Sequence, residues 1–282
     1  MRLMIAWVAF AAALGAQPHR IVSTSPSVTE TLFALGLGGN VVGVSQHCHY
    51  PPEALAKPKV GTYVNPNVEA IVALRPDLVI VQDKANNAAV QLRRVGVATL
   101  ELTIGDLNTV FATVEAIGKR CGVPDRAAKL NADLRARLDA IRRRTAGTPR
   151  RSLIFIVGRS PGNLDNLTAV GRGSYLNELI EIAGGVNALA QTAMPYPKVS
   201  VESIIGVNPD VLVDMGDMAE TTGVTDAHKR SVVALWSHYS TLKAVQHGRV
   251  FAVASDIFVV PGPRVVDAAE AFERMLHTGS AP

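Results

Sequence analysis

A thirteen-residue phrase occurs twice in the chain, and an internal repeat of this kind limits the possible folds more than any other feature. The copies are VEAIVALRPDLVI at residues 68–80 and VESIIGVNPDVLV at residues 201–213, and their glutamates and Pro-Asp pairs align without a gap. Each copy predicts a short capped helix that ends before a proline, followed by a buried strand of a parallel sheet. The repeat therefore predicts two similar α/β lobes.

Length and composition agree with two lobes. The 282 residues exceed the usual size of one domain, and an apolar content of 48% is enough for two cores. Strand and helix patterns alternate, so we expect an α/β fold of two Rossmann-like lobes joined by a single long inter-lobe helix. The predicted boundaries are residues 17–105 for the first lobe, 106–147 for the helical linker and 148–282 for the second lobe. A long helix there should restrict the lobes to a small hinge motion.

Residues 1–16 have the pattern of a signal peptide. Arg2 precedes an apolar run too short to span a membrane, and small residues follow it. Position 17 is Gln17 and not the cysteine that a lipoprotein needs, so we expect a soluble protein exported to the periplasm. Cys48 and Cys121 can pair in such a compartment or remain two free thiols, and the sequence leaves both open.

The net charge of +4 is modest, and its densest part is the arginine run at residues 142–144 and 150–151. This run lies at the end of a predicted helix, where cations complement the helix dipole. The chain has no recognisable nucleic-acid-binding motif, so we expect no nucleic acid partner. Ser27 and Glu30 have the spacing of a capping box at the start of an early helix.

Two lobes place a cleft between them, and ligands of α/β sheets bind at the carboxyl ends of strands and at domain interfaces. Loops expected at those ends are residues 45–50, 63–67, 82–86, 158–164, 194–198, 216–218 and 255–263.

Motifs spread over nearly all of the chain after residue 17 form a recognisable set. In the first half they are RIVS at 20–23, SP at 25–26, TE at 29–30, VGVS at 42–45, YPP at 50–52, NVE at 67–69 and PD at 76–77. In the second half they are GGVN at 184–187, PYPKVS at 195–200, VE at 201–202, SD at 255–256, Phe258 and PR at 263–264. With this set the chain resembles the helix-linked (cluster A, class III) periplasmic solute-binding proteins of ABC importers, and among them the cobalamin-binding branch.

This resemblance implies a monomer that captures a corrinoid, cobalamin, between its lobes and delivers it to an inner-membrane ABC permease dimer. The corrinoid is then a transported ligand, and the protein has no catalytic role and no catalytic cofactor. The resemblance also implies that Glu69 and Glu202 form ion pairs with arginines of the importer, one per lobe. Their alternative role is to stabilise the first turns of their helices.

The resemblance further assigns ligand contacts. His47, Tyr63 and Tyr196 stand where the family has aromatic corrinoid contacts, and aromatic faces suit a flat macrocycle. Gln82 stands where the family has another aromatic residue, so this side of the cleft offers less aromatic surface to the ligand. Tyr50 either contacts the ligand or packs on the prolines after it.

Two further contacts are expected on the last cleft loop, where the family binds the amide side chains of the corrinoid. They are Asp256 and Phe258, and a carboxylate such as that of Asp256 can accept hydrogen bonds from amides. Asp256 could equally cap a turn.

Other ligand classes remain open, because haem- and siderophore-binding relatives share the fold. A ferric siderophore predicts a basic cleft, for which Arg159 and Lys84 are the candidates. The sequence His47-Cys48-His49 lacks the four ligands of a structural zinc site, so we expect no protein-bound metal. One of its ring nitrogens could still ligate the metal inside a bound macrocycle.

An exported serine hydrolase is the alternative from a different class. Residues 158–162 read G-x-S-x-G with Ser160 at the centre. A nucleophile elbow needs a helix directly after the serine, whereas Pro-Gly here predicts a loop.

Overall fold

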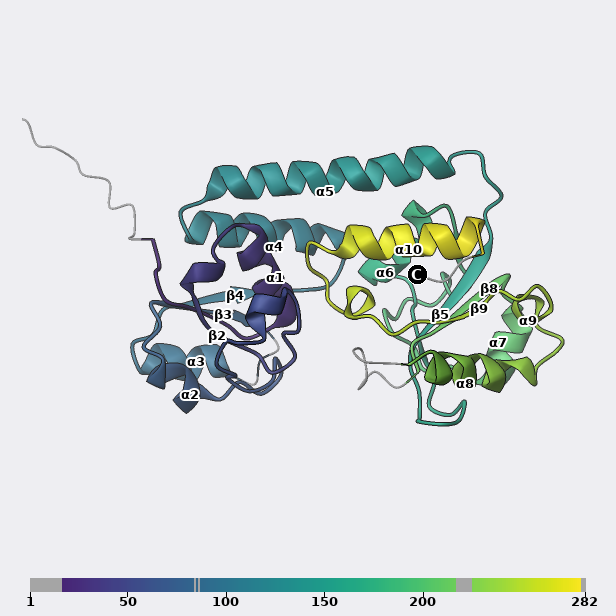
Figure 1. The fold of residues 1–282 in the computed structure, drawn as a ribbon, viewed down its shortest axis with the longest axis horizontal. Coiled ribbons are helices and arrows are strands. Elements are labelled where there is room, and N and C mark those ends of the chain that lie inside the picture. Colours follow the sequence, from purple (N-terminus) through teal and green to yellow (C-terminus); the bar gives the residue numbers. More distant parts are fainter. Residues whose placement is uncertain (1–16, 84, 86, 217–224, 280–282) are drawn as a thin grey trace, which may run out of the picture.

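The computed structural model describes residues 17–83, 85, 87–216 and 225–279. Two α/β lobes lie side by side, and a long helix runs along both of them (Figure 1). The predicted fold class is therefore confirmed. The predicted signal peptide and Lys84 lie outside the described residues. Within the described ranges we find no helix with the length and apolarity needed to cross a bilayer.

The first lobe is built on a parallel sheet of strand order β2-β1-β3-β4. Its strands are β1 (Ile21–Ser23), β2 (Val41–Val44), β3 (Leu78–Gln82) and β4 (Thr99–Leu102). Its helices are α1 (Pro26–Ala34), α2 (Val68–Ala73) and α3 (Ala88–Arg94), with short 3-10 turns η1 (Gly38–Asn40) and η2 (Pro52–Ala54).

The second lobe repeats this arrangement. Strand β5 pairs in parallel with β7 and β8, and β8 with β9, so the order β7-β5-β8-β9 matches β2-β1-β3-β4, while β6 adds an antiparallel edge. Its strands are β5 (Ser152–Gly158), β6 (Thr168–Ala169), β7 (Val186–Asn187), β8 (Val211–Asp214) and β9 (Val250–Ala252). Its helices are α6 (Tyr175–Ile182), α7 (Val201–Val207), α8 (Asp226–Ser237), α9 (Lys243–Gln246), η3 (Asp256–Phe258) and α10 (Val265–His277).

The repeated phrase forms the same local structure in both lobes. Asn67 caps α2 and Ser200 caps α7, each by accepting a hydrogen bond from the amide three residues later. The residue before each proline, Arg75 or Asn208, has a left-handed backbone with φ of 47° and 45°. This conformation is uncommon outside glycine and ends each helix before its strand begins.

The aspartate of each Pro-Asp pair anchors the first strand of its lobe. One carboxylate oxygen of Asp77 accepts the Arg20 amide at 3.0 Å, just before β1. The corresponding oxygen of Asp210 accepts the amide of Ser152, the first residue of β5, at 2.9 Å and its hydroxyl at 2.8 Å. Both copies of the phrase therefore fix the register of the neighbouring strand.

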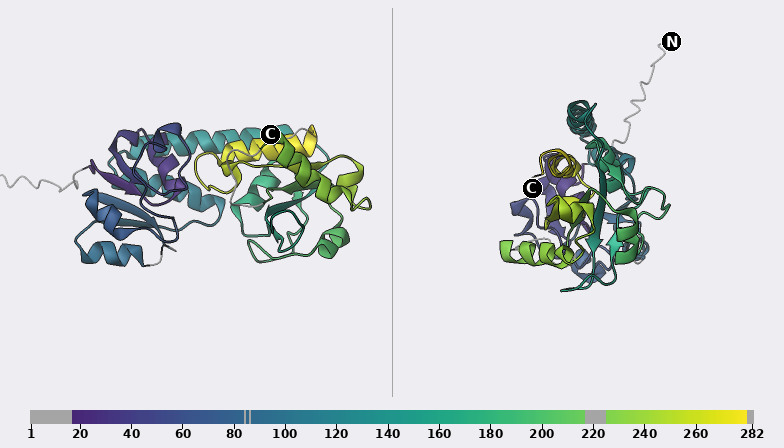
Figure 2. Two further views of the ribbon diagram at one scale, coloured as in Figure 1. Left: turned by 60° about the horizontal axis from the view of Figure 1, so that its bottom comes forward. Right: turned by 90° about the vertical axis from the view of Figure 1, so that its right-hand side faces the viewer.

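The linker consists of two antiparallel helices, α4 (Leu107–Arg120) and α5 (Pro124–Thr145), which pack against each other along the top of the molecule (Figures 1 and 2). The 22 residues of α5 make it about 33 Å long. Helix α4 also crosses the lobe boundary: Leu107 and Phe111 belong to the second lobe's core, and Val114 and Ile117 to the first lobe's core. The predicted long helix is present, and α4 braces it.

Both cysteines are free thiols in the core of the first lobe. Cys48 and Cys121 are each fully buried, and the Cys48 sulfur lies 3.1 Å from the Thr29 hydroxyl oxygen. Burial raises the pKa of both thiols to about 11. Of the two possibilities left open by the sequence, the structure has the unpaired one.

Candidate ligand-binding site

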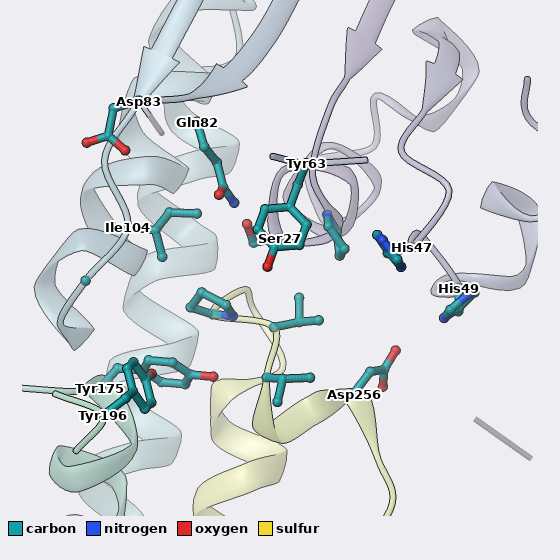
Figure 3. Close-up of a pocket in the computed structure, with 15 residues that line it drawn as sticks. Ser27, His47, His49, Tyr63, Gln82, Asp83, Ile104, Tyr175, Tyr196 and Asp256 are labelled. Carbon is teal, nitrogen blue, oxygen red and sulfur yellow. The ribbon is translucent and has the colours of Figure 1, made fainter. Parts of the chain in front are cut away.

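A cavity of about 600 Å³ lies between the two lobes. This size is within the usual range of small-molecule sites. Figure 3 shows the side chains that line it. From the first lobe they are Pro26, Ser27, His47, His49, Tyr63, Gln82 and Asp83; from the segment before α4, Ile104 and Gly105; and from the second lobe, Tyr175, Tyr196, Asp256, Val259, Val260 and Pro261.

The cavity brings together five of the residues singled out in the sequence: His47, Tyr63, Gln82, Tyr196 and Asp256. His47 follows the carboxyl end of β2 and Gln82 is the last residue of β3, so both lie at the edge of a parallel sheet where ligands bind. The parallel order of the sheet thus places residues from separate segments on one wall.

Aromatic rings face the cavity from both lobes. The His47 and Tyr63 rings meet edge to face with their centroids 6.1 Å apart. Tyr63 is 44% exposed and Tyr196 is 43% exposed, so both rings retain surface that a ligand can cover. Large apolar faces of this kind suit a flat organic ligand.

Two expected contacts do not line the cavity. Phe258 is fully buried and packs against Phe155 and Phe272, with centroids 5.4 and 5.3 Å apart. Its predicted ligand contact is therefore corrected: the ring belongs to the core of the second lobe. The ring of Tyr50 lies beneath the Arg264 guanidinium, 4.0 Å from ring centroid to Cζ, and contributes to the contact between the lobes.

Asp256 is part of a charge network at the edge of the cavity. Its carboxylate accepts a hydrogen bond from Arg264 at 2.9 Å, and Arg264 also pairs with Glu30 of the other lobe. Glu30 is 4% exposed. Burial, opposed by Arg264, raises the pKa of Glu30 to about 7. In the sequence Glu30 belongs to a capping box and to the TE motif at 29–30, and neither pattern identifies Arg264 as its partner.

Other lining residues were not singled out as ligand contacts in the sequence. His49, Asp83, Val259 and Val260 lie on loops expected at the cleft, whereas Tyr175, the start of α1 and Ile104-Gly105 lie outside those loops. The Tyr175 hydroxyl donates a hydrogen bond to the Phe258 carbonyl at 2.9 Å. For the loop residues the signal was their position after a predicted strand, and the other residues have no such signal in the sequence.

The described part of the cavity wall carries no lysine or arginine. Arg159, one of two predicted cleft cations, is buried in the second lobe, where its Nε lies 3.0 Å from a carboxylate oxygen of Asp214. The same carboxylate accepts the Trp236 indole N–H at 2.6 Å. Arg159 is thus a structural cation, and the wall's charged side chains among the described residues are Asp83 and Asp256.

Ser160 lacks the surroundings of a catalytic nucleophile. Its hydroxyl accepts a hydrogen bond from the Asn166 amide at 2.8 Å. The chain after it turns into the antiparallel strand β6 and does not enter a helix. The nucleophile elbow of a hydrolase is therefore absent at this position. Elsewhere in the described ranges, we find no cluster of three or more His, Cys, Asp or Glu side chains that could hold a metal.

Glu69 and Glu202 lie outside the cavity, in the first turns of α2 and α7. Both side chains are exposed. A hydrogen bond from the Ser200 hydroxyl, followed by one from its own backbone, lowers the pKa of Glu202. Each lobe therefore presents one carboxylate at an equivalent position.

Comparison with known proteins identifies the family of this chain. The model of a family described as periplasmic binding protein matches residues 21–257. The chain belongs to the periplasmic binding protein family. Proteins of this family bind ligands for transport and are not enzymes. The match covers the first lobe, the linker and the second lobe as far as η3.

Three relatives illustrate which ligands occur on this fold. The vitamin B12-binding protein of Vibrio cholerae is 29% identical over 89% of this chain and 87% of its own, and its crystal structure superposes with a TM-score of 0.76, covering 93% and 98% of the two chains. A cobalamin-binding protein of Halobacterium salinarum is 32% identical over 94% of this chain and 71% of its own. The haem-binding protein RhuT of Roseiflexus, in apo form, superposes with a TM-score of 0.76 at 27% identity and covers 92% and 99%.

Proposed function

We propose that this periplasmic binding protein captures a corrinoid, cobalamin, in the cavity between its lobes and delivers it to an inner-membrane ABC permease dimer. It acts in the periplasm as a soluble monomer, after export directed by residues 1–16. It carries out no reaction, and the corrinoid is its cargo.

The chemistry of the cavity wall supports a corrinoid. Aromatic rings reach the cavity from both lobes, and the described wall has no lysine or arginine. A corrinoid offers a flat macrocycle with uncharged amide side chains, which suit aromatic faces and neutral hydrogen-bonding groups. Haem propionates and the catecholates or carboxylates of many ferric siderophores are anionic and favour arginine or lysine partners. Two of the relatives are named for vitamin B12 or cobalamin binding, which points in the same direction.

Haem is the second candidate, because two histidines line the cavity. His47 and His49 lie on the same loop, and imidazole is a common axial ligand of haem iron. A haem-binding relative shares the fold at 27% identity. The acidic residues Asp83 and Asp256 on the wall count against an anionic ligand.

We further propose that Glu69 and Glu202 dock the two lobes on the permease. They are exposed, lie at equivalent positions of the repeat and are separate from the cavity. A two-fold symmetric permease requires the same kind of contact from each lobe.

Calorimetric titration of the purified protein with cobalamin, cobinamide, haemin and a ferric siderophore tests the ligand. We expect submicromolar binding of cobalamin and much weaker binding of the two iron ligands. Tight binding of an iron ligand alone would refute the corrinoid assignment.

A further inference from the structure

The second lobe's wall of the cavity has very few hydrogen-bond donors. Its side chains are those of Tyr175, Tyr196, Asp256, Val259, Val260 and Pro261. The valines and the proline have no polar side-chain atom, so any side-chain donor on this wall must come from the other three.

Two of these three have no proton to offer a ligand. The Tyr175 hydroxyl already donates to the Phe258 carbonyl at 2.9 Å, inside a side chain that is 3% exposed. The Asp256 carboxylate accepts from Arg264 at 2.9 Å and is an acceptor only. Tyr196 alone remains as a donor among the described side chains of this wall.

Ser174 sets the direction of the hydrogen bond that it shares with the Tyr196 hydroxyl. Its Oγ donates to the Tyr196 hydroxyl oxygen at 3.2 Å. As the cap of α6, the same Oγ accepts the Leu176 amide at 3.1 Å, and Ser174 is 1% exposed. A hydroxyl has one proton, and Ser174 uses its proton on Tyr196. The proton of Tyr196 itself therefore stays free for another acceptor.

We propose that the Tyr196 hydroxyl is the hydrogen-bond donor of the second lobe's wall, that it binds an acceptor oxygen of the ligand, and that Ser174 is the positioning residue that keeps it a donor. Tyr196 and Tyr175 lie next to each other on this wall, across the cavity from Tyr63 and Gln82 (Figure 3). For the identity of the acceptor the proposal rests on the proposed function: a corrinoid offers the carbonyl oxygens of its amide side chains. A ligand without an acceptor at this point leaves the hydroxyl unpaired and binds less tightly.

The test compares two tyrosine-to-phenylalanine variants by calorimetry with cobalamin. Y196F keeps the ring and removes the donor, and we expect its affinity to fall about tenfold, the usual effect of one hydrogen bond. Y239F is the matched control: Tyr239 lies outside the cavity, with its ring centroid 6.2 Å from that of Trp236, and we expect a change of less than about twofold. Equal affinities of Y196F and the wild type would overturn the proposal.

The role of Ser174 needs a double mutant, because S174A also removes a helix cap. If Ser174 acts through Tyr196, S174A weakens binding in the wild type and has no further effect in Y196F. The same loss in both backgrounds would show that Ser174 acts through α6 and would overturn its positioning role. Should the wild type bind haemin and not cobalamin, the proposed function is wrong. The same variants titrated with haemin then decide on Tyr196 separately.

Discussion

Arg264, next to the first residue of the last helix, forms an ion pair with Glu30, which is 234 residues earlier in the other lobe. The guanidinium Nε lies 3.0 Å from one carboxylate oxygen, and a second hydrogen bond joins Nη2 to the other oxygen. Arg264 also contacts Asp256 and covers the Tyr50 ring. One side chain thus fastens the two lobes at the edge of the cavity.

Replacing Arg264 by glutamine should destabilise the protein by about 3 kcal/mol, because it leaves the buried Glu30 without its partner. Urea unfolding followed by circular dichroism measures the change. R137Q is the control: Arg137 pairs with Asp267 in an exposed position, and its loss should cost less than about 1 kcal/mol. Similar values for the two variants would contradict a structural role for the inter-lobe pair.

The stability of the protein should depend on Glu30 between about pH 4.5 and pH 7. Burial raises the pKa of Glu30 from 4.5 to about 7, so in this window the folded chain holds a proton that the unfolded chain has released. The contribution of Glu30 to the free energy of unfolding therefore falls as the pH rises, by about 3 kcal/mol in total. Unfolding curves of wild type and E30Q at a series of pH values give the difference. A difference that is independent of pH would count against this assignment.

Reversing the charge of both docking glutamates should abolish delivery but leave binding intact. We expect E69R/E202R to bind cobalamin like the wild type, because both residues lie outside the cavity. Uptake of radiolabelled cobalamin into spheroplasts supplied with purified protein should fall at least about tenfold, the effect of losing a 1.4 kcal/mol contact. E53R alters an exposed glutamate outside the repeated phrase and serves as the control. Lost binding in the double variant would place the pair in the ligand site.

Removing the Asp210 carboxylate, which anchors the start of β5, should destabilise the second lobe. Asp210 accepts two hydrogen bonds from Ser152, so D210A should cost about 2 kcal/mol at neutral pH. Burial alone would raise the pKa of Asp210, but the Ser152 amide and hydroxyl, with Lys243 and Arg249, lower it. The difference between variant and wild type should shrink as the pH falls below 3.8, because the ionised carboxylate is the form that the fold favours. D139A, at an exposed pair with Arg142, provides the comparison in the same unfolding assay.

The two thiols should be unreactive in the folded protein. Cys48 and Cys121 are fully buried and burial raises their pKa to about 11, so the thiolate is scarce at pH 8. Alkylation by iodoacetamide, followed by mass spectrometry, should modify neither cysteine until a denaturant is added and both afterwards. Modification under native conditions would contradict the buried position of the thiol concerned.

The repeat allowed the architecture to be predicted because its pattern is local. The caps Asn67 and Ser200, and the prolines that follow each helix, are visible within thirteen residues and were found as expected. The equal strand order of the two sheets follows from the same duplication.

Contacts between distant segments could not be predicted. Ser27 and Glu30 have the spacing of a capping box, but Ser25 occupies the cap position and Glu30 pairs with Arg264 instead. Phe258 stands on a cleft loop in the sequence, yet its ring turns into the core. The spacing of residues along the chain does not show which side chains of a loop face the ligand, and those side chains form the binding site.

Helices α4 and α5 each contribute side chains to the cores of both lobes, so neither lobe is complete without them. Leu107 and Val114 on one helix complete different cores, and Ala127 and Leu134 do the same on the next. A chain cut at any point between the lobes would leave an apolar half-face without a partner in each fragment. We therefore expect the two halves of this protein to unfold together in one transition, although each carries the same pattern of strands and helices.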